Sequence, residues 1–566
     1  MTNAQASVDE QIYTLAMPTN EPGWVGAFVD DSVAFRFSSF VVANSNEGIR
    51  DGRGYPCLDF KSDSCKAQPR VTFNLFLPPC SPAIQVNCIS EFAAITKDGR
   101  EIAGKFKSYS PALSEPTFKG DPSKKFPDGW FPSLWNFDGI NHPGGGDFLL
   151  RTSLLSFQAF TDDPMKFAQL RVAVNAVNFQ SHPSRGTWRP VDVNQSLENG
   201  IMSAGGAEAS DCKFFLAVNE CASAWPLPND VRFRITVKTQ AKLSGWINGR
   251  ILNPSITSSV DNDGNSIYSI EAGSLQVPVY AVWKKHSELS KDFRDFLYQA
   301  GGQAGTITYP LLWRSVYSGS GPEPFDKISA NHTLNIYNEA NFQEFLYFIK
   351  EAGDKSIATK SMWHFETNQN YDTQENIEVR RCSEQKVGIS GVVSTNSTMF
   401  LANPPKFNLQ TQSLDYKVAA PHLDKNGNMN RGTYDLIIDS QVARCLYGFN
   451  SAPVNASVSV INTEGVEQVA TTTVKEKDGW LHLAANGYTY SSPTLRVKLS
   501  QDAPTKPVET QNSQATVTAP VTQEASKATT KVKKVSVKKS ITCVKGKVTQ
   551  KITGTNPKCP VGYKKK

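Results

Sequence analysis

Residues 432–501 carry the clearest strand pattern in the chain, and this pattern constrains the fold more than any other feature. Residues 495–499 read Leu-Arg-Val-Lys-Leu, and residues 456–460 read Ala-Ser-Val-Ser-Val. A side-chain period of two gives a strand with one buried and one solvated face. Asp-Gly at 478–479 and Asn-Gly at 486–487 supply the positive φ angles that tight turns need. We therefore predict a meander of short antiparallel strands, including Cys445, that forms at least one layer of a sandwich.

Similar strand patterns, interrupted by glycine and proline, extend over most of the chain. A hydrophobic content of 39% and a charged content of 20% fit a globular protein rich in β structure. The predicted fold class is mainly β, with several antiparallel β-sandwich-like domains, a small α/β segment and then a disordered basic tail. We predict an N-terminal β-rich region of one or more domains (8–284), a mixed helix and strand segment (285–385), a C-terminal β-sandwich module (386–501), a disordered linker (502–540) and a basic two-cysteine tail (541–566).

Two helices are predicted within the mixed segment. The first extends from Glu288 to Ala300, with Ser287 as its N-cap and two glycines after its end. The second extends from Glu339 to Ala352 and is followed by Gly353. It carries a wide apolar stripe, which is more often a packing face than a ligand site. We therefore assign the second helix to the core, over a sheet.

The ten cysteines fall into five pairs. We predict the disulfides Cys57–Cys65, Cys80–Cys88, Cys212–Cys221, Cys382–Cys445 and Cys543–Cys559. A nested arrangement, Cys57–Cys88 with Cys65–Cys80, fits the same spacing. Free or metal-binding cysteines are the less favoured alternative, because no pair has the Cys-x-x-Cys spacing of zinc or redox sites. An even number of close cysteine pairs is typical of proteins from an oxidising compartment.

Other features agree with export from the cytosol. The chain has no apolar run of roughly 18 residues or more, so we predict no transmembrane segment. Residues 3–7 read Asn-Ala-Gln-Ala-Ser, the small-x-small pattern of a signal-peptidase site with cleavage after Ala6. A chance Ala-x-Ala is the alternative, since no charged or apolar segment precedes it. We predict that the protein is secreted or lies on the extracellular cell surface.

Positive charge is concentrated in the C-terminal part of the chain. Residues 506–566 contain 14 lysines and two acidic residues, a net charge of +12. Because the whole chain carries +6, residues 1–505 carry −6. We predict that the tail is retained on an anionic cell envelope, such as a phosphate-bearing wall polymer, by electrostatic attraction. A solvated tail is the alternative, and nucleic acid is not an expected partner because the tail is nearly free of aromatic residues. The lysines expected to act are Lys531, Lys533, Lys534, Lys538, Lys539, Lys564, Lys565 and Lys566.

The C-terminal module contains three distinctive motifs, at residues 444–449 (Arg-Cys-Leu-Tyr-Gly-Phe), 478–480 (Asp-Gly-Trp) and 491–499 (Ser-Ser-Pro-Thr-Leu-Arg-Val-Lys-Leu). These motifs resemble a module in large, uncharacterised secreted proteins of actinobacteria. Residues 541–566 resemble a short basic tail that recurs on such proteins. The resemblance covers residues 388–501 and the tail, and it reaches the N-terminal half only loosely. It implies a cell-surface location and transfers no catalytic residue.

No motif points to a catalytic centre or to a metal site. The sequence has neither a Gly-x-Ser-x-Gly elbow nor a His-Glu-x-x-His motif. Residues 261–265 (Asp-Asn-Asp-Gly-Asn) and 424–428 (Asp-Lys-Asn-Gly-Asn) are rich in oxygen ligands, but neither fits an EF-hand loop. Hairpin turns explain both segments. We therefore predict no cofactor and no metal, with structural calcium as the less favoured alternative.

The best candidate for a binding site is a glycine- and proline-rich loop region with aromatic and acidic side chains. It combines Trp130 and Trp135 with Asp128, Asp138 and Asp147. Aromatic rings stack on the apolar faces of sugars and carboxylates accept their hydroxyl groups, so we predict a glycan site. Paired carboxylates also catalyse glycoside hydrolysis, but only at a defined separation. The competing interpretation is a long loop that its own aromatic side chains anchor to the core.

Two hypotheses for function follow from these features. The first is a secreted, cell-surface-associated structural or adhesive protein without a catalytic centre, whose tail is retained on the anionic cell envelope. The alternative is an extracellular carbohydrate-binding or glycan-hydrolysing protein. The sequence favours the first hypothesis over an enzyme and leaves the ligand and the oligomeric state open.

Overall fold

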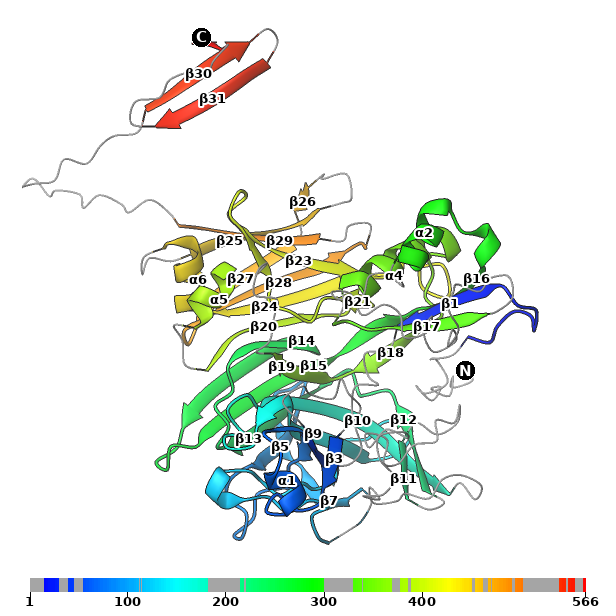
Figure 1. Cartoon of the computed structure of the whole chain (residues 1–566), viewed down its shortest axis with the longest axis vertical. Coiled ribbons are helices and arrows are strands. Elements are labelled where there is room, and N and C mark those ends of the chain that lie inside the picture. The colour runs from blue at the N-terminus through cyan, green and yellow to red at the C-terminus, as the bar shows by residue number, and fades with distance from the viewer. Residues whose placement is uncertain are drawn as a thin grey trace, which may run out of the picture. The chain divides into compact units, whose positions relative to one another are not determined.

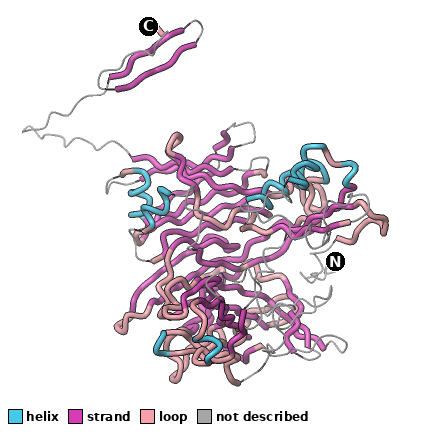
Figure 2. Tube along the Cα trace, viewed as in Figure 1, coloured by secondary structure: helices cyan, strands magenta, loops and turns pink. Residues whose placement is uncertain are grey.

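The computed structural model of the chain is mainly β, as predicted, and contains several antiparallel sheets (Figures 1 and 2). The chain divides into two compact units, residues 1–504 and residues 505–566. The structure describes residues 15–29, 39–44, 54–110, 112, 114–181, 214–217, 220–299, 329–337, 339–368, 377–384, 388–449, 454–461, 467–469, 471–490, 494–501, 539–545, 548–554 and 563–565.

One large sheet extends through the first unit. All its neighbouring strands are antiparallel except β14 and β20, which run parallel. Through this pair, the sheet joins strands of the predicted N-terminal region to strands of the predicted C-terminal module. The strand order is β3 (Gly54–Cys57), β2 (Phe40–Asn44), β4 (Arg70–Phe76), β9 (Asp147–Phe160), β10 (Gln169–Ser181), β19 (His364–Asn368), β14 (Gly245–Val260), β20 (Ile389–Thr395), β24 (Gly432–Asp439), β28 (Trp480–Tyr488) and β27 (Thr471–Lys477).

β14 also belongs to a second sheet, because its two halves have different neighbours. Residues 246–250 pair with β19 in the large sheet, whereas residues 251–260 pair with β15. The second sheet has the order β6 (Glu101–Ala103), β5 (Cys88–Thr96), β13 (Val231–Thr239), β15 (Ser266–Val279) and β14, and β18 (Ala358–Met362) pairs with the end of β15.

The second sheet and part of the large sheet enclose the first hydrophobic core. On β13, buried apolar residues alternate with half-buried polar ones, so one face of this strand faces the core. Phe233 of β13 packs against Phe92 of β5 and Phe148 of β9, with ring centroids 5.9 and 5.5 Å away. Two shorter pairs of strands extend the large sheet: β8 (Ser133–Asn136) with β7 (Lys105–Tyr109) beside β9, and β12 (Glu220–Trp225) with β11 (Phe214–Ala217) beside β10.

A third sheet covers the other part of the large sheet and encloses the second core. The alternating residues Leu495, Val497 and Leu499 are buried in this core, as the strand pattern predicted. They pack with buried residues of β24 and β28, which belong to the large sheet. The third sheet has the order β21 (Met399–Phe400), β23 (Ser413–Ala419), β29 (Thr494–Gln501), β25 (Val454–Ile461) and β26 (Glu467–Val469), and β22 (Lys406–Asn408) pairs with β23.

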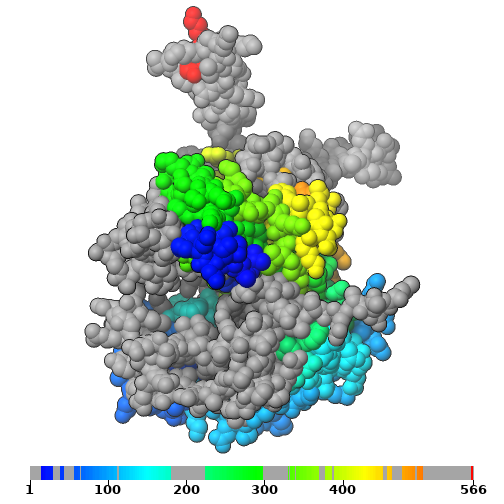
Figure 3. Space-filling model, turned by 90° about the vertical axis from the view of Figure 1, so that its right-hand side faces the viewer, coloured from blue at the N-terminus to red at the C-terminus, as the bar shows by residue number. Residues whose placement is uncertain are grey.

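A small sheet and two helices extend the second core. The sheet consists of β16 (Ala281–Lys285), β1 (Trp24–Val29) and β17 (Ala330–Leu334). In the space-filling view of Figure 3, the blue surface of β1 lies against the green surface of the segment that follows β15. Helix α4 (Glu339–Ala352) has the predicted bounds, and its aromatic stripe is buried.

The other predicted helix begins later than expected. α2 (Lys291–Gln299) follows a 3-10 turn, η5 (His286–Glu288), and Ser290 rather than Ser287 accepts the N-terminal hydrogen bond, from the N–H of Phe293. The Ser287 cap was therefore wrong. None of the helices that the structure describes is long and apolar enough to cross a membrane.

Cys445 lies on a helix, which corrects the prediction of an uninterrupted meander in this region. α6 (Ser440–Tyr447) begins at Asp439, whose carboxylate accepts hydrogen bonds from two backbone N–H groups of the first turn. It ends at Gly448, which has a φ of 66°. The predicted disulfide joins Cys445 to Cys382 of α5 (Ile377–Ser383).

Two further predicted disulfides are present near the N-terminus. Cys65 of the short helix α1 (Asp63–Lys66) is joined to Cys57 of β3, and Cys80 is joined to Cys88 of β5. The nested arrangement is therefore wrong. The predicted pairs Cys212–Cys221 and Cys543–Cys559 involve residues outside the described part of the chain.

The turn predictions had mixed outcomes. Asp478 and Gly479 have φ angles of 52° and 78° and connect β27 to β28, as predicted. Residues 261–265 form the hairpin turn between β14 and β15. Asn486-Gly487 does not form a turn, because it lies inside β28 at a bulge opposite β24.

The second unit contains paired strands where the sequence predicts a disordered basic tail. β30 (Lys539–Lys545) pairs with β31 (Val548–Gly554) and with β32 (Lys564–Lys565), and both pairings are antiparallel. The predicted basic tail therefore includes a three-stranded sheet. The predicted linker at 502–540 lies almost wholly outside the described residues.

Candidate functional site

Trp135 belongs to the first core rather than to an open binding face. It is 6% exposed, and its Nε1 donates a hydrogen bond of 2.7 Å to the Ser133 hydroxyl. Its ring meets Phe92 and Phe106 edge to face, with centroids 5.7 and 5.6 Å away. The structure therefore places this tryptophan where the anchoring interpretation expects it.

Trp130 is half-buried and stacks on an aromatic residue that sequence reasoning missed. Its ring centroid lies 4.9 Å from that of Tyr109, with the planes 25° apart. Phe106 is 41% exposed, and the centroid of its ring lies 5.2 Å from that of Tyr109. Phe106, Tyr109 and Trp130 form what we call the aromatic row. Burial raises the pKa of Tyr109 to about 12, so its phenol stays neutral and can donate a hydrogen bond.

Backbone contacts fix the position of the aromatic row. The N–H of Trp130 donates to the carbonyl of Phe76, and its carbonyl accepts a hydrogen bond from the Ser39 hydroxyl. Phe106 and Tyr109 are three residues apart on β7, and a bulge between Phe106 and Ser108 interrupts the alternation of the strand. Because these contacts join distant segments, no local sequence signal identified the row.

The three predicted carboxylates have separate partners. Asp128 accepts a hydrogen bond of 2.7 Å from the N–H of Gly120. Asp138 pairs with Lys105 and Asp147 pairs with Lys107, each at 2.7 Å. Each carboxylate is thus held individually, and this arrangement does not favour a cooperating acid and base for glycoside hydrolysis.

His142 has a structural role in this loop region. The N–H of Gly144 donates to its Nδ1 at 3.1 Å, so Nε2 carries the proton and donates to the carbonyl of Asp147 at 2.9 Å. Burial lowers the pKa of His142 and favours this neutral form. The imidazole therefore cross-links the turn of residues 142–147.

The oxygen-rich turn after β14 uses its ligand atoms internally. Asp261 accepts hydrogen bonds from the N–H groups of Asp263 and Asn265, and it pairs with Lys238 at 2.7 Å. Residues 424–428 repeat the hydrogen bonds within the turn. Among the residues that the structure describes, no group of three or more His, Cys, Asp or Glu side chains could hold a metal ion.

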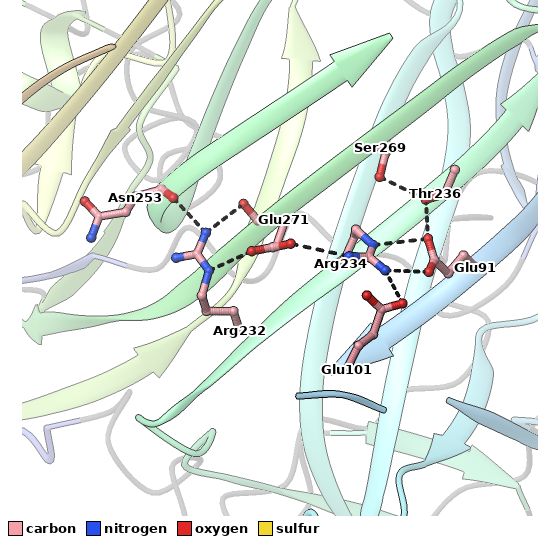
Figure 4. Close-up of polar contacts among 8 residues, drawn as sticks. All are labelled: Glu91, Glu101, Arg232, Arg234, Thr236, Asn253, Ser269 and Glu271. Carbon is pink, nitrogen blue, oxygen red and sulfur yellow. Dashed lines mark hydrogen bonds and ion pairs between the residues drawn. The ribbon is translucent and has the colours of Figure 1, made fainter. Parts of the chain in front are cut away.

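The outer face of the second sheet carries a network of ion pairs, shown in Figure 4. At its centre, Arg234 contacts Glu91 at 2.8 Å and Glu271 at 3.6 Å, and it also pairs with Glu101. The hydrogen bond from Arg234 is the main reason that the pKa of Glu91 is lowered. The network joins β5, β6, β13 and β15, so it fixes the register of four strands.

A second arginine connects this network to the edge of the sheet. Arg232 pairs with Glu271 at 2.9 Å and donates to the carbonyl of Asn253 on β14 at 3.0 Å (Figure 4). The Thr236 hydroxyl contacts both Glu91 and the Ser269 hydroxyl at 2.9 Å. These polar side chains satisfy one another, which favours a structural role over ligand binding.

The predicted envelope-binding lysines all belong to the second unit. Lys539 belongs to β30, and Lys564 and Lys565 form β32, where Lys564 is exposed. Lys531, Lys533, Lys534, Lys538 and Lys566 lie outside the described residues.

No known protein family matches this chain, and no curated protein matches it. The class of protein therefore rests on the fold alone: a mainly β chain with layered antiparallel sheets and disulfide-bonded cysteines.

Proposed function

We propose that this chain is a secreted, cell-surface-associated structural or adhesive protein whose basic tail is retained on an anionic cell envelope. The main observation that supports this proposal is the presence of three disulfides within the first unit. Disulfides persist in oxidising surroundings and are rare in reducing ones, so they support a location outside the cytosol. The carboxylates of Asp138 and Asp147 and the imidazole of His142, near the aromatic row, are used in structural contacts, which favours binding over catalysis.

The tail supplies the proposed attachment. Residues 506–566 carry a net charge of +12, whereas residues 1–505 carry −6. A polymer with phosphate or carboxylate groups would attract the tail and not the remainder of the chain. Salt screens such exposed charges, so retention should fall steeply as ionic strength rises.

Retention can be tested with cell-wall sacculi prepared with and without their phosphate polymers. Full-length protein should bind the first preparation at low salt, bind the second weakly, and dissociate at about 0.5 M salt. Replacing the eight predicted lysines by glutamine should abolish binding, whereas replacing them by arginine should preserve it. Binding that survives both high salt and the glutamine substitutions would contradict the proposal. The positions changed are Lys531, Lys533, Lys534, Lys538, Lys539, Lys564, Lys565 and Lys566.

The aromatic row favours a second candidate, glycan binding by the same surface protein. Phe106 presents an exposed ring, and the pairs Lys105–Asp138 and Lys107–Asp147 supply polar groups at the same hairpin and its loops. An exposed aromatic ring beside fixed polar groups suits a sugar, which has both apolar faces and hydroxyl groups.

A glycan array tests this candidate. Phe106→Ala and Trp130→Ala should each lose any specific signal, while the variants keep the wild-type melting temperature within a few degrees. Trp135→Ala is a poor probe, because the loss of a buried tryptophan costs about 3 to 5 kcal/mol. An array with no specific signal for the wild type would exclude the candidate and would leave the envelope proposal untouched.

A further inference from the structure

The outer edge of β14 is an uncovered strand. Residues 255–260 pair with β15 on one side, and on the other side no described residue provides a backbone partner. Five of these six residues are exposed, and only Ile256 is buried. In Figure 1 this hairpin reaches the left-hand margin of the first unit. A strand in this position presents a row of backbone donors and acceptors to solvent.

The hairpin bond identifies which backbone groups face outward. The N–H of Asp261 donates to the carbonyl of Asn265, and hydrogen-bonded pairs alternate along an antiparallel ladder. Ser255, Thr257 and Ser259 therefore bond to β15. The N–H and C=O groups of the residues between them, Ile256, Ser258 and Val260, point to the open edge.

This edge lacks the charged side chains that several other edge strands of the molecule carry. Lys105 and Lys107 lie on β7, β16 ends with Lys284 and Lys285, and β27 ends with Lys-Glu-Lys at 475–477. Such charges prevent strands of other molecules from adding to a sheet. Residues 254–260 read Pro-Ser-Ile-Thr-Ser-Ser-Val and contain no charge.

The open edge also exposes an apolar side chain. Val260 is 67% exposed, more than any other large hydrophobic residue in the described part of the chain. Ile256, which is 4% exposed, lies four residues earlier in the strand, on the same face of the sheet. An uncharged edge with an exposed valine is favourable for pairing with another strand.

We propose that residues 255–260 pair antiparallel with the same residues of a second copy of this chain, forming a symmetric dimer. With Ser258 opposite its own counterpart, all three outward-facing residues of each copy make ladder hydrogen bonds. This register places Val260 of one copy beside Ile256 of the other, which covers its exposed surface.

Charges at the ends of the strands agree with this register. It brings the exposed tip of the hairpin, which carries Asp263, towards the region of Asn253 in the second copy. The carbonyl of Asn253 accepts a hydrogen bond from Arg232, so the carboxylate of Asp263 would approach a guanidinium that already pairs with Glu271. An uncharged centre with opposite charges at its ends is self-complementary, as a two-fold interface must be.

Sedimentation velocity of the full-length protein between about 1 and 100 μM tests the proposal, at a salt concentration of about 0.3 M to suppress tail contacts. The wild type should show a concentration-dependent dimer. Ser258→Pro removes an N–H that β15 does not use and should weaken the dimer at least tenfold without unfolding the hairpin. Ser258→Thr, the matched control, should dimerise like the wild type.

A charge exchange keeps the test decisive if the proline variant fails to fold. Ser258→Lys and Ser258→Glu should each be monomeric, because like charges lie directly opposite across the axis. An equimolar mixture of the two should dimerise again. A monomeric wild type at all concentrations, or a dimer that persists in all three disruptive variants, would overturn the proposal.

Discussion

Replacing Asp435 with asparagine should stabilise the protein more at neutral pH than at acidic pH. Asp435 lies on β24 and is 6% exposed, and its Oδ2 accepts a hydrogen bond of 3.0 Å from the N–H of Asn253. Burial raises the pKa of Asp435 to about 6, because desolvation outweighs this hydrogen bond and the charge of Arg232. The folded protein therefore binds this proton more tightly than the unfolded chain does.

The size and the sign of the effect follow from linkage. A rise in pKa from 3.8 to about 6 corresponds to about 3 kcal/mol of unfolding free energy. Because the pKa of Asp435 is higher in the folded protein than in the unfolded chain, the protonated carboxyl contributes its full stabilisation at pH values below the unfolded pKa. This contribution is lost as the pH rises through about 6. Asparagine imitates the neutral carboxyl and does not titrate. The free energy of unfolding of Asp435→Asn, relative to that of the wild type, should therefore rise by about 2 kcal/mol between pH values of about 4.5 and 7.5.

Urea unfolding, followed by the fluorescence of the ten tryptophans, measures this difference at each pH. Asp261→Asn should behave oppositely, because a hydrogen bond from Lys238 lowers the pKa of Asp261 and stabilises the protein above the unfolded pKa. If the wild type and Asp435→Asn respond identically to pH, the buried carboxyl is not held neutral and the reasoning is wrong.

Three further predictions concern stability and can be checked by urea or thermal unfolding. The double substitution of Cys382 and Cys445 by serine should cost about 4 kcal/mol, because this disulfide closes a loop with a sequence separation of 63. The corresponding change at Cys80 and Cys88, with a separation of 8, should cost only about 2.5 kcal/mol, and equal losses would contradict the loop-entropy argument. Arg250→Met should cost about 3 to 5 kcal/mol, because it leaves three buried carbonyl groups without their donor, and a loss below about 1 kcal/mol would refute this role. Removing calcium with a chelator should leave the melting temperature unchanged, since both oxygen-rich turns hold their carboxylates with internal donors, and a fall of several degrees would show a structural ion.

Local signals predicted the elements whose stability depends on neighbouring residues in the sequence. The bounds of α4 follow from its helical stripe and from Gly353, and the turn at Asp478 and Gly479 follows from its need for positive φ angles. The alternation at residues 495–499 identified a buried strand, because a period of two has a direct consequence for which side chains meet the core.

α6 shows how tertiary context obscures a local signal. Asp439 as N-cap and Gly448 as C-cap were both readable in the sequence, but the helix has only 8 residues and lies between two strand patterns. Helices this short depend on packing for their stability, and the second core together with the disulfide at Cys445 supplies it.

The candidate site was predictable only in part, because residue type does not determine burial. Trp130 and Trp135 are five residues apart and look equivalent in the sequence, yet Trp130 stacks on Tyr109 while Trp135 lies in the core. The difference arises from the pairing of β7 with β8, which brings together residues more than 20 positions apart. Phe106 and Tyr109 were missed for the same reason.

The organisation of the first unit depends on the point where β14 leaves the large sheet. Arg250 is fully buried there, and its guanidinium donates to the carbonyl of Thr395 at the end of β20 and to those of Ser397 and Thr398 in the loop that follows. It also lies over the ring of Phe400, 4.4 Å from the centroid.

These contacts fix the direction of β14 where its neighbours change, so one strand serves both hydrophobic cores. Residues 245–251 are buried throughout, whereas most residues from 253 to 260 are exposed, and the change coincides with an irregularity in the pairing with β15 between Leu252 and Ser255. A boundary drawn between an N-terminal and a C-terminal β region therefore crosses a continuous hydrogen-bonded ladder. This continuity has a mechanical consequence: separating the two cores requires breaking the parallel pairing of β14 with β20, rather than extending a flexible linker.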